Sequence, residues 1–184
     1  MPNVFDLDQV KTCNPQAAEL EAINFDNVLV GMPYKEGYIR FQLGGESFCL
    51  PAQNIRGVSG AQSLLPAINS GLEVVGCLFS LGRTLPVLDL RPKLNLHPVA
   101  LSKKSSIVLV SLATDPRLRA GIVVEQLETT IRFSVDRVKN RRHEDVPVQF
   151  VRGLVQEGEE KIWVLDLEFL INPADLRRLE MYPS

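Results

Sequence analysis

One segment of the chain recurs without a gap, and this repeat limits the folds that the sequence can adopt. The stretch GCLFSLGRTLPVLDL at 76–90 aligns with GLVQEGEEKIWVLDL at 153–167. Each copy opens on a glycine, carries another glycine near its middle and closes on VLDL. A strand, a tight turn and a returning strand are expected in each copy. Two structural units of related build are therefore predicted.

Each copy ends in an aspartate that precedes helix-like sequence. A carboxylate at such a position can accept hydrogen bonds from the free N–H groups of a first helical turn, so helices are predicted to begin after Asp89 and Asp166. Chance recurrence of a common strand ending is the alternative, and the shared spacing from the first glycine disfavours it. Six residues are thus expected to shape the repeated hairpins: Gly76, Gly82, Asp89, Gly153, Gly158 and Asp166.

Period-two alternation marks further strands outside the repeat. Apolar and polar residues alternate over 38–50 around Gly44-Gly45, which is typical of a β-hairpin. The runs at 106–112 and 120–124 predict two more strands joined by a turn. Residues 52–72 are rich in glycine and polar residues and predict a short helical turn and a loop.

The chain is expected to be mostly β, with two small β-barrels packed together and short helices at both ends. Residues 1–36 predict an extension whose short helix starts at Asn14-Pro15. Residues 37–172 are expected to form the domain of two barrels. Residues 173–184 are expected to form a final helix, begun by Asn172-Pro173, and a tail.

The cysteines and the chain start favour a cytoplasmic protein. Three single cysteines without a CxxC pair are typical of reduced thiols, and Cys49 and Cys77 lie in apolar runs where cysteine behaves as a small core residue. The sequence MPNVFDLDQVK has no basic stretch followed by an apolar core, so no secretory signal is expected. No uncharged apolar run approaches the roughly 20 residues of a membrane helix.

The sequence carries no recognised catalytic motif. His97 and His143 are the chain's two histidines, and neither lies in a recognisable motif. The sequence has no GxSxG, HExxH or GxxxxGK[ST] pattern. A Cys77–His143 nucleophile is disfavoured by the apolar neighbours of the cysteine. The expectation is a protein that is not an enzyme and that uses no cofactor and no metal.

A basic run offers a nucleic-acid-binding alternative. It contains Arg137, Lys139, Arg141 and Arg142 within the polar connection 134–147, and Glu144 and Asp145 follow at once. Such a run could contact phosphates, and a steep loss of affinity with salt would mark that mode. A solvated loop is favoured, because the acidic neighbours offset the charge and the whole chain carries a net charge of -2.

Four segments together resemble the CheW family of chemotaxis adaptors in order and spacing. They are FQLGGESFCLP, GCLFSLGRTLPVLDLRPKL, IVLVSL with AGIVVEQLETTI, and FVRGLVQEGEEKIWVLDLEFLI, and they cover residues 38 to about 172. The resemblance implies two five-stranded, SH3-like barrels. It also implies a role without catalysis, in which the protein couples chemoreceptors to the histidine kinase CheA through apolar patches on both barrels and a groove between them.

The chain departs from the family pattern at the first hairpin. The family usually reads Asn-Leu-Arg-Gly where this chain has Phe79-Ser80-Leu81-Gly82, so Leu81 replaces an arginine of the contact surface. Arg83 lies where the family often has a basic residue. The resemblance thus implies that Leu81 and Arg83 at the hairpin, with Ile55 and Val58 along the groove, bind partners. For Ile55 and Val58, a plain core role is an equal alternative.

Two hypotheses about the function of the chain remain open after these departures. In the first, the chain is a coupling adaptor of the CheW type in a bacterial chemosensory pathway. In the second, it is a repurposed CheW-like protein that binds the kinase and recruits no receptor. The lack of any aspartate or glutamate from Cys49 to Leu72 favours joint loss of an arginine and an acidic partner, because a lone buried charge is costly.

Overall fold

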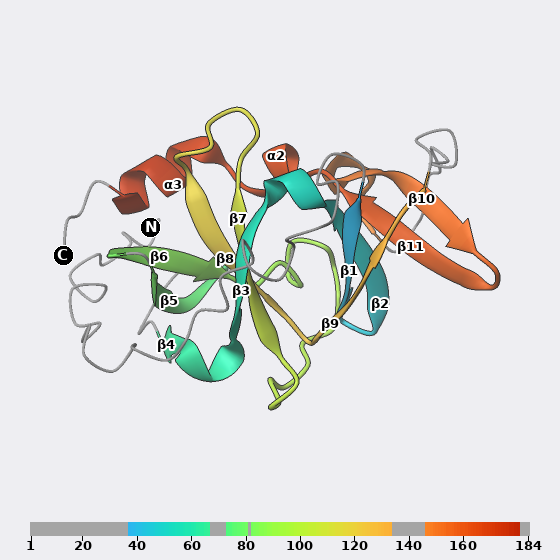
Figure 1. The fold of residues 1–184 in the computed structure, drawn as a ribbon, viewed down its shortest axis with the longest axis horizontal. Helices are drawn as coiled ribbons and strands as arrows, with labels where there is room; N and C mark the ends of the chain where they lie inside the picture. The colour runs from blue at the N-terminus through green and yellow to red at the C-terminus, as the bar shows by residue number, and fades with distance from the viewer. Residues whose placement is uncertain (1–36, 67–72, 81, 134–145, 181–184) are drawn as a thin grey trace.

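The computed structural model describes residues 37–66, 73–80, 82–133 and 146–180, which form two β-sheets (Figure 1). The strands are β1 (Tyr38–Leu43), β2 (Glu46–Pro51), β3 (Ile55–Gly60), β4 (Leu65–Pro66), β5 (Val74–Ser80), β6 (Arg83–Leu88), β7 (Ser106–Ser111), β8 (Arg119–Val124), β9 (Gln126–Ile131), β10 (Val151–Glu157) and β11 (Glu160–Leu165). The helices are α2 (Leu167–Leu170), α3 (Pro173–Glu180) and three 3-10 turns, η3 (Ala52–Asn54), η4 (Ala61–Ser63) and η6 (Val148–Phe150).

The strand orders of the two sheets correspond to each other. The first sheet, called the first barrel below, runs β10-β11-β2-β1-β9. The second, called the second barrel, runs β3-β7-β8-β6-β5 and adds the two-residue strand β4 at its edge. In each, a hairpin lies in the middle, a second hairpin joins it through a parallel contact and a single strand closes the other side. The mostly β fold of two small barrels predicted from the sequence is confirmed.

The single closing strand is exchanged between the two barrels. Strand β3 follows the β1–β2 hairpin along the chain and pairs with β7 of the second barrel. Strand β9 follows the β7–β8 hairpin and pairs with β1 of the first barrel. The second barrel is therefore formed by the continuous segment 55–124, and the first barrel by the segments on either side of it, 38–51 and 126–165.

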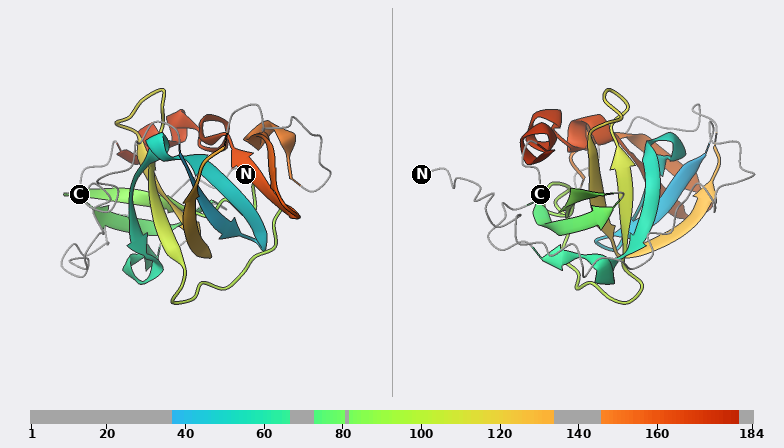
Figure 2. Two further views of the ribbon diagram at one scale, coloured as in Figure 1. Left: turned by 45° about the vertical axis from the view of Figure 1, so that its right-hand side comes forward. Right: turned by 60° about the vertical axis from the view of Figure 1, so that its left-hand side comes forward.

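The sequence repeat corresponds to two equivalent hairpins. In β5–β6, Gly76 pairs with Val87 after a register shift, and in β10–β11, Gly153 pairs with Val164 after a similar shift. Gly82 and Gly158 lie at the hairpin tips with φ of 73° and 60°, a conformation that favours glycine. The hairpins lie at opposite ends of the molecule (Figures 1 and 2).

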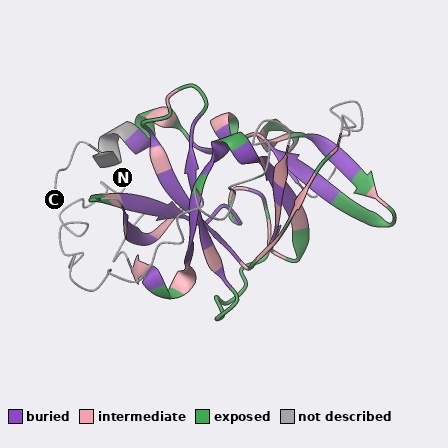
Figure 3. Ribbon diagram, in the orientation of Figure 1, coloured by how far each residue is buried: buried purple, intermediate pink, exposed green. Residues whose placement is uncertain are grey.

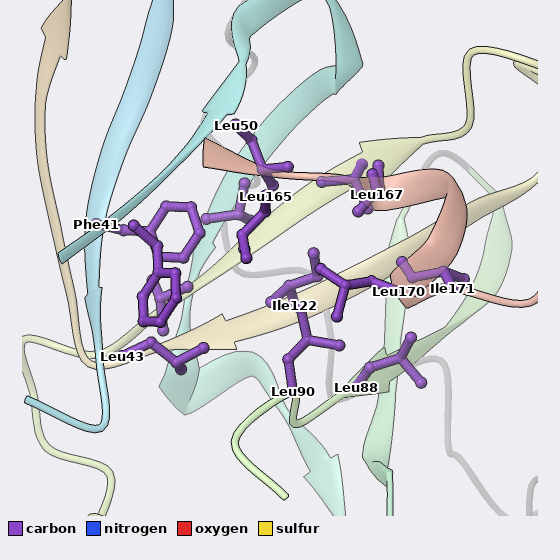
Figure 4. Close-up of a cluster of buried hydrophobic side chains, with 14 of the residues drawn as sticks. Phe41, Leu43, Leu50, Leu88, Leu90, Ile122, Leu165, Leu167, Leu170 and Ile171 are labelled. Carbon is purple, nitrogen blue, oxygen red and sulfur yellow. The ribbon is translucent and has the colours of Figure 1, made fainter. Parts of the chain in front are cut away.

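Most of the buried side chains belong to one core that both sheets share. Strands of both barrels and helix α2 contribute to it, and their buried stretches face one another (Figures 3 and 4). Its largest fully buried members include Phe41, Leu50, Ile122, Leu165 and Leu170. Two smaller clusters lie in the individual barrels, with Leu78, Leu85 and Val87 in the second and Val155, Ile162 and Val164 in the first. The shared core therefore joins the barrels into one packed unit.

The sequence prediction was wrong in part of 52–72. The expected helical turn is present as η3, but the structure contains strand β3 where a loop was predicted. Alternation is weak in IRGVSG because Gly57 and Gly60 supply no side chains. The strand forms because β7 pairs with it from Ile55 to Gly60, a contact between residues about fifty positions apart that local sequence does not encode.

The helix predicted after Asp89 is also absent. The chain makes one turn, in which the Leu94 N–H donates to the Leu90 carbonyl at 3.0 Å. Asn95 then adopts a φ of 56°, and the Leu96 N–H donates back to the Arg91 carbonyl at 2.9 Å. This left-handed residue ends the turn in the manner of a helix C-cap.

Other local predictions are confirmed. The β1–β2 hairpin turns at Gly44 and Gly45, with φ of 61° and 81°. Helix α3 begins at Pro173, and the Asn172 side chain accepts from the Ala174 N–H at 2.9 Å. The predicted helix in 1–36 and nearly all of the connection 134–147 lie outside the described residues. The domain limits at 37 and 172 stay predictions.

Candidate partner-binding surface

The predicted contact residues of the first hairpin lie at the tip of β5–β6. Arg83 is exposed, opens strand β6 and pairs with Ser80 of β5. Leu81 lies outside the described residues. The tip thus presents the Arg83 guanidinium at one end of the molecule, where a partner could contact it. Binding through Leu81 and Arg83 stays a prediction.

The two residues predicted to line the groove pack into the shared core. Ile55 and Val58 on β3 are each 6% exposed. Arg56, between them in the chain, is exposed. A partner at β3 would therefore meet Arg56 before either apolar side chain. A role of Ile55 and Val58 in binding stays a prediction.

Gly76 lies where a neighbouring strand approaches closely. A Cβ atom at this position would lie 2.4 Å from the Leu65 carbonyl oxygen and 2.7 Å from Leu64 Cδ1. These atoms belong to β4 and to the residue before it, and β4 pairs with β5 here. The glycine thus allows the edge strand to close on the hairpin. Gly153 is buried at the equivalent place of β10.

Asp89 belongs to an ion-pair network between the barrels. It is 8% exposed, and its carboxylate accepts from Arg91 Nε at 2.9 Å and from Arg91 Nη2 at 2.6 Å. Arg91 Nη1 lies 3.5 Å from Glu125 Oε1 and donates to the Val99 carbonyl. Glu125 in turn accepts from the Gly44 N–H at 2.6 Å. The hydrogen bonds with Asp89 raise the pKa of Arg91 above its ordinary value.

This network fixes four segments relative to one another. Asp89 follows the repeated hairpin, Arg91 and Val99 frame the next loop, and Glu125 links β8 to β9. Gly44 lies in the β1–β2 turn of the other barrel. A helix-capping role was predicted for Asp89 from the sequence, whereas its ion pair with Arg91 was not predicted.

Asp166 performs the capping role that was predicted for both aspartates. Its side chain accepts from the Glu168 N–H at 3.3 Å, at the start of α2. It also accepts from Arg152 Nε at 3.1 Å, which ties α2 to β10. Both copies of VLDL therefore end in an aspartate that pairs with an arginine, but among the described residues only the second copy leads into a helix.

A second charged cluster lies on the first barrel and was not identified from sequence. Arg40 Nε lies 2.6 Å from Glu128 Oε2, and Arg40 Nη1 lies 2.8 Å from Glu160 Oε2. Arg40 Nη2 also donates to Ser47 Oγ at 3.1 Å. These contacts join β1 to β9, β2 and the start of β11. The hydrogen bond with Glu160 raises the pKa of Arg40. The antiparallel pairing of β1 with β2 and β9 and the parallel pairing of β2 with β11 bring these residues together.

An exposed aromatic side chain follows Asp166. Phe169 on α2 is 69% exposed, the largest exposure among the described large hydrophobic residues. The preceding Glu168 accepts from the N–H groups of Ala113 and Thr114 and from the Thr114 hydroxyl. This anchor fixes α2 to the β7–β8 loop, so Phe169 is displayed from a rigid turn. Aromatic residues of this kind are common anchors of protein interfaces.

The described part of the chain offers no arrangement for metal binding. No group of three or more His, Cys, Asp or Glu side chains suited to a metal ion occurs among the described residues. None of the described helices is long and apolar enough to cross a membrane. His143 and the basic residues Arg137–Arg142 lie outside the described residues, so both alternatives that depend on them stay untested.

The two cysteines among the described residues are as buried as predicted, but only Cys49 is a free thiol. Cys49 is a free thiol with 0% exposure, and Cys77 is 3% exposed. Cys77 is disulfide-bonded, so the prediction of reduced thiols was wrong for this residue. Burial raises the pKa of the Cys49 thiol to about 12.

Cys49 is expected to resist alkylation in the folded protein. With the pKa near 12, its thiolate fraction at pH 8 is about a thousandfold lower than for a thiol of pKa near 9. Iodoacetamide labelling at pH 8, followed site by site by mass spectrometry, should proceed at Cys49 only as fast as the protein unfolds. The same site in urea-unfolded protein is the control. Rapid labelling of the native protein would contradict the raised pKa.

Comparisons with known proteins agree on one family. The family model of the CheW-like domain matches residues 37–174. The probable chemotaxis protein CheW of Rhizobium etli is 22% identical over 139 residues, which cover 74% of this chain and 88% of that protein. The chemotaxis protein CheW of Treponema pallidum is 20% identical over 146 residues, which cover 77% and 85%.

A solved structure supports the fold independently of these sequence matches. The scaffolding protein TtCheW from Thermoanaerobacter tengcongensis has a TM-score of 0.67 to this chain, with 20% sequence identity. The similarity covers 78% of this chain and 93% of that one. Since the family model spans well over half of the sequence, the chain belongs to the CheW-like domain family.

Proposed function

We propose that this chain is a non-catalytic adaptor of bacterial chemosensory signalling that couples chemoreceptors to a CheA-type histidine kinase in the cytoplasm. The observation that carries the proposal is the family match over residues 37–174. Two relatives named as chemotaxis proteins and one solved scaffolding protein support it. Residues 37–172 are proposed as the unit that binds partners, with 1–36 and 173–184 as its extensions.

The fold supplies what an adaptor needs physically. Its two repeated hairpins lie at opposite ends, and the shared core holds both barrels in one orientation. A protein interface of standard size takes about 800 Å² from each partner, so separate ends can serve separate proteins. Arg83 at one end and the anchored Phe169 on α2 are proposed as contacts, because Arg and aromatic residues dominate interface energetics.

Replacing Arg83 with alanine is expected to weaken receptor binding. Loss of an interface arginine commonly costs about 1–2 kcal/mol, which is about a five- to thirtyfold rise in Kd. Isothermal titration with a soluble receptor signalling fragment measures the change. Arg132→Ala, which removes another exposed arginine on the other barrel, is the matched control and should leave Kd unchanged. Equal effects of both substitutions would contradict a specific role of Arg83.

Restoring the family arginine tests the departure at the hairpin. Leu81→Arg is expected to tighten receptor binding by about tenfold if the remaining contact surface is intact, since one good charged contact contributes about 1.4 kcal/mol. Leu81→Lys carries the same charge without the planar guanidinium and should recover less. Unchanged receptor binding in Leu81→Arg would contradict a contact role for this position.

Capture from a cell lysate distinguishes the coupling adaptor from the repurposed form. The full chain serves as bait at moderate salt, and mass spectrometry identifies the retained proteins. Recovery of a CheA-type kinase together with a methyl-accepting receptor supports coupling. A kinase without receptor supports the repurposed form, and RNA or an unrelated enzyme in place of both would contradict the proposal.

A further inference from the structure

The second barrel carries an open hollow beside a partly apolar loop. Ala61 and Gln62 of η4 line one side, and Leu101, Ser102 and Lys103 line the other, around a volume of about 710 Å³. Val99 and Leu101 on this loop are 40% and 41% exposed, which is unusual among the described large hydrophobic residues. We call the hollow and residues 96–104 the loop face.

The loop face is held rigidly at both ends. The Ser102 N–H donates to Ser105 Oγ at 2.9 Å, and the Ala61 N–H donates to the Ser105 carbonyl at 3.1 Å. At the other end, Arg91 donates to the Val99 carbonyl from the buried network with Asp89. A surface fixed in this way loses little conformational entropy when a partner binds to it.

The loop face is positively charged, although the chain as a whole is acidic. The lining residues 61–62 and the loop 96–104 contain Lys103 and Lys104 and no aspartate or glutamate. The net charge of the chain is -2. A partner for this surface should therefore offer apolar side chains flanked by carboxylates.

The chain itself contains such a segment outside the described residues. Residues 1–36 hold six acidic residues and two lysines, a net charge of -4. Within the helix predicted after Asn14-Pro15, Ala17, Leu20 and Ile23 recur every third residue and share one helical face. Glu19 and Glu21 fall at the margins of that face.

We propose that residues 15–25 dock on the loop face, with Leu20 and Ile23 against Leu101 and the two glutamates toward Lys103 and Lys104. The point of attachment permits it, because Gly37, the first residue after the extension, accepts a hydrogen bond of 2.9 Å from the Ala52 N–H. Strand β3 leads from there to η4 over about 20 Å, whereas the chain from residue 25 to 37 can span about 40 Å.

Covalent connection makes a weak contact sufficient. A tethered segment has an effective concentration in the millimolar range, so even a modest intrinsic affinity keeps it bound for much of the time. The docked segment would cover the loop face against other proteins. This inference does not depend on the receptor or the kinase, and it holds or fails whatever the outcome of the lysate capture.

Zero-length coupling with a carbodiimide tests the contact directly. The full chain is treated in reducing buffer, mixed with an equal amount of ¹⁵N-labelled chain, and its amide cross-links are mapped by mass spectrometry. Links from Glu19 or Glu21 to Lys103 or Lys104 within one chain are expected, several-fold more often than links to Lys161. Lys161 is the control because it is an exposed lysine on β11 of the other barrel. Equal linkage to Lys161, or links mainly between light and heavy chains, would overturn the proposal.

A paired substitution tests the apolar half of the contact. Leu20→Asp with Ile23→Asp should reduce the links at Lys103 and Lys104 to the level at Lys161, and should increase amide hydrogen exchange in residues 99–104. Both residues lie outside 37–172, so the barrels should fold as before. Val28→Asp with Val30→Asp is the matched control and should change neither readout. Unchanged links and exchange in the first variant would overturn the assigned helix face.

Discussion

Replacing Arg91 with methionine is expected to lower the free energy of unfolding by about 3–5 kcal/mol, because it leaves a buried carboxylate unpaired. Asp89 is 8% exposed, and Arg91 donates to it through Nε, Nη2 and the backbone N–H. Arg91 also contacts Glu125, which holds the β1–β2 turn through Gly44. Its loss should therefore loosen the junction between the barrels as well.

The chain provides a matched control for this experiment. Arg117 and Asp115 form the same local pair, two residues apart, with Arg117 Nε 3.1 Å from Asp115 Oδ1. The side chain of Arg117 is 87% exposed, against 8% for Arg91. Arg117→Met should therefore cost no more than about 1 kcal/mol, since water screens and replaces the lost contact. Urea unfolding at pH 7 measures both variants.

Arg91→Lys separates charge from geometry at the same site. Lysine restores the positive charge near Asp89 but cannot donate in two directions from a planar group. The free energy of unfolding of Arg91→Lys is expected to lie between those of the wild type and Arg91→Met. If Arg91→Met and Arg117→Met lowered the free energy of unfolding equally, the burial of Asp89 would not determine the size of the effect.

Hairpins were predictable because their information is local. Alternating residues and a glycine at each turn specify β1–β2 within fourteen residues, and the same signals identify β5–β6 and β10–β11. The repeat added the expectation of two related units. Each of these predictions depends on residues that are neighbours in the sequence.

The exchange of β3 and β9 was not predictable from such signals. The partner of β3 is β7, and the partner of β9 is β1, and each pairing joins opposite halves of the chain. Sequence patterns indicate that a segment is extended, whereas the choice of neighbour depends on the packing of the whole sheet. For β3 even the extended pattern was obscured by Gly57 and Gly60.

The candidate surface was predicted only where the family resemblance supplied it. Arg83 came from its position in the hairpin, and the structure adds that it is exposed there. Phe169 was not predicted as an exposed contact residue, because a single aromatic residue after Asp166 resembles part of an amphipathic helix. Its exposure follows from Glu168 reaching the β7–β8 loop more than fifty residues away.

Phe41→Ala is expected to lower the free energy of unfolding by about 3–5 kcal/mol. Phe41 is 0% exposed and stacks on Phe48 with ring centroids 6.3 Å apart. It belongs to the core that strands of both barrels share. Phe169→Ala is the control, because it deletes the same atoms from a site that is 69% exposed, and it should cost less than about 0.5 kcal/mol.

The unfolding curve of Phe41→Ala also tests whether the shared core couples the two barrels. The second barrel occupies the continuous segment 55–124 between the two parts of the first, and both barrels share one core, so the two barrels should unfold together. Trp163, the one tryptophan, lies in the first barrel and reports on it by fluorescence, whereas far-UV circular dichroism reports on both barrels. The two signals should give the same midpoint in urea. A fluorescence transition that precedes the dichroism transition would mean that the second barrel stays folded without the first, contrary to a single core that couples both barrels.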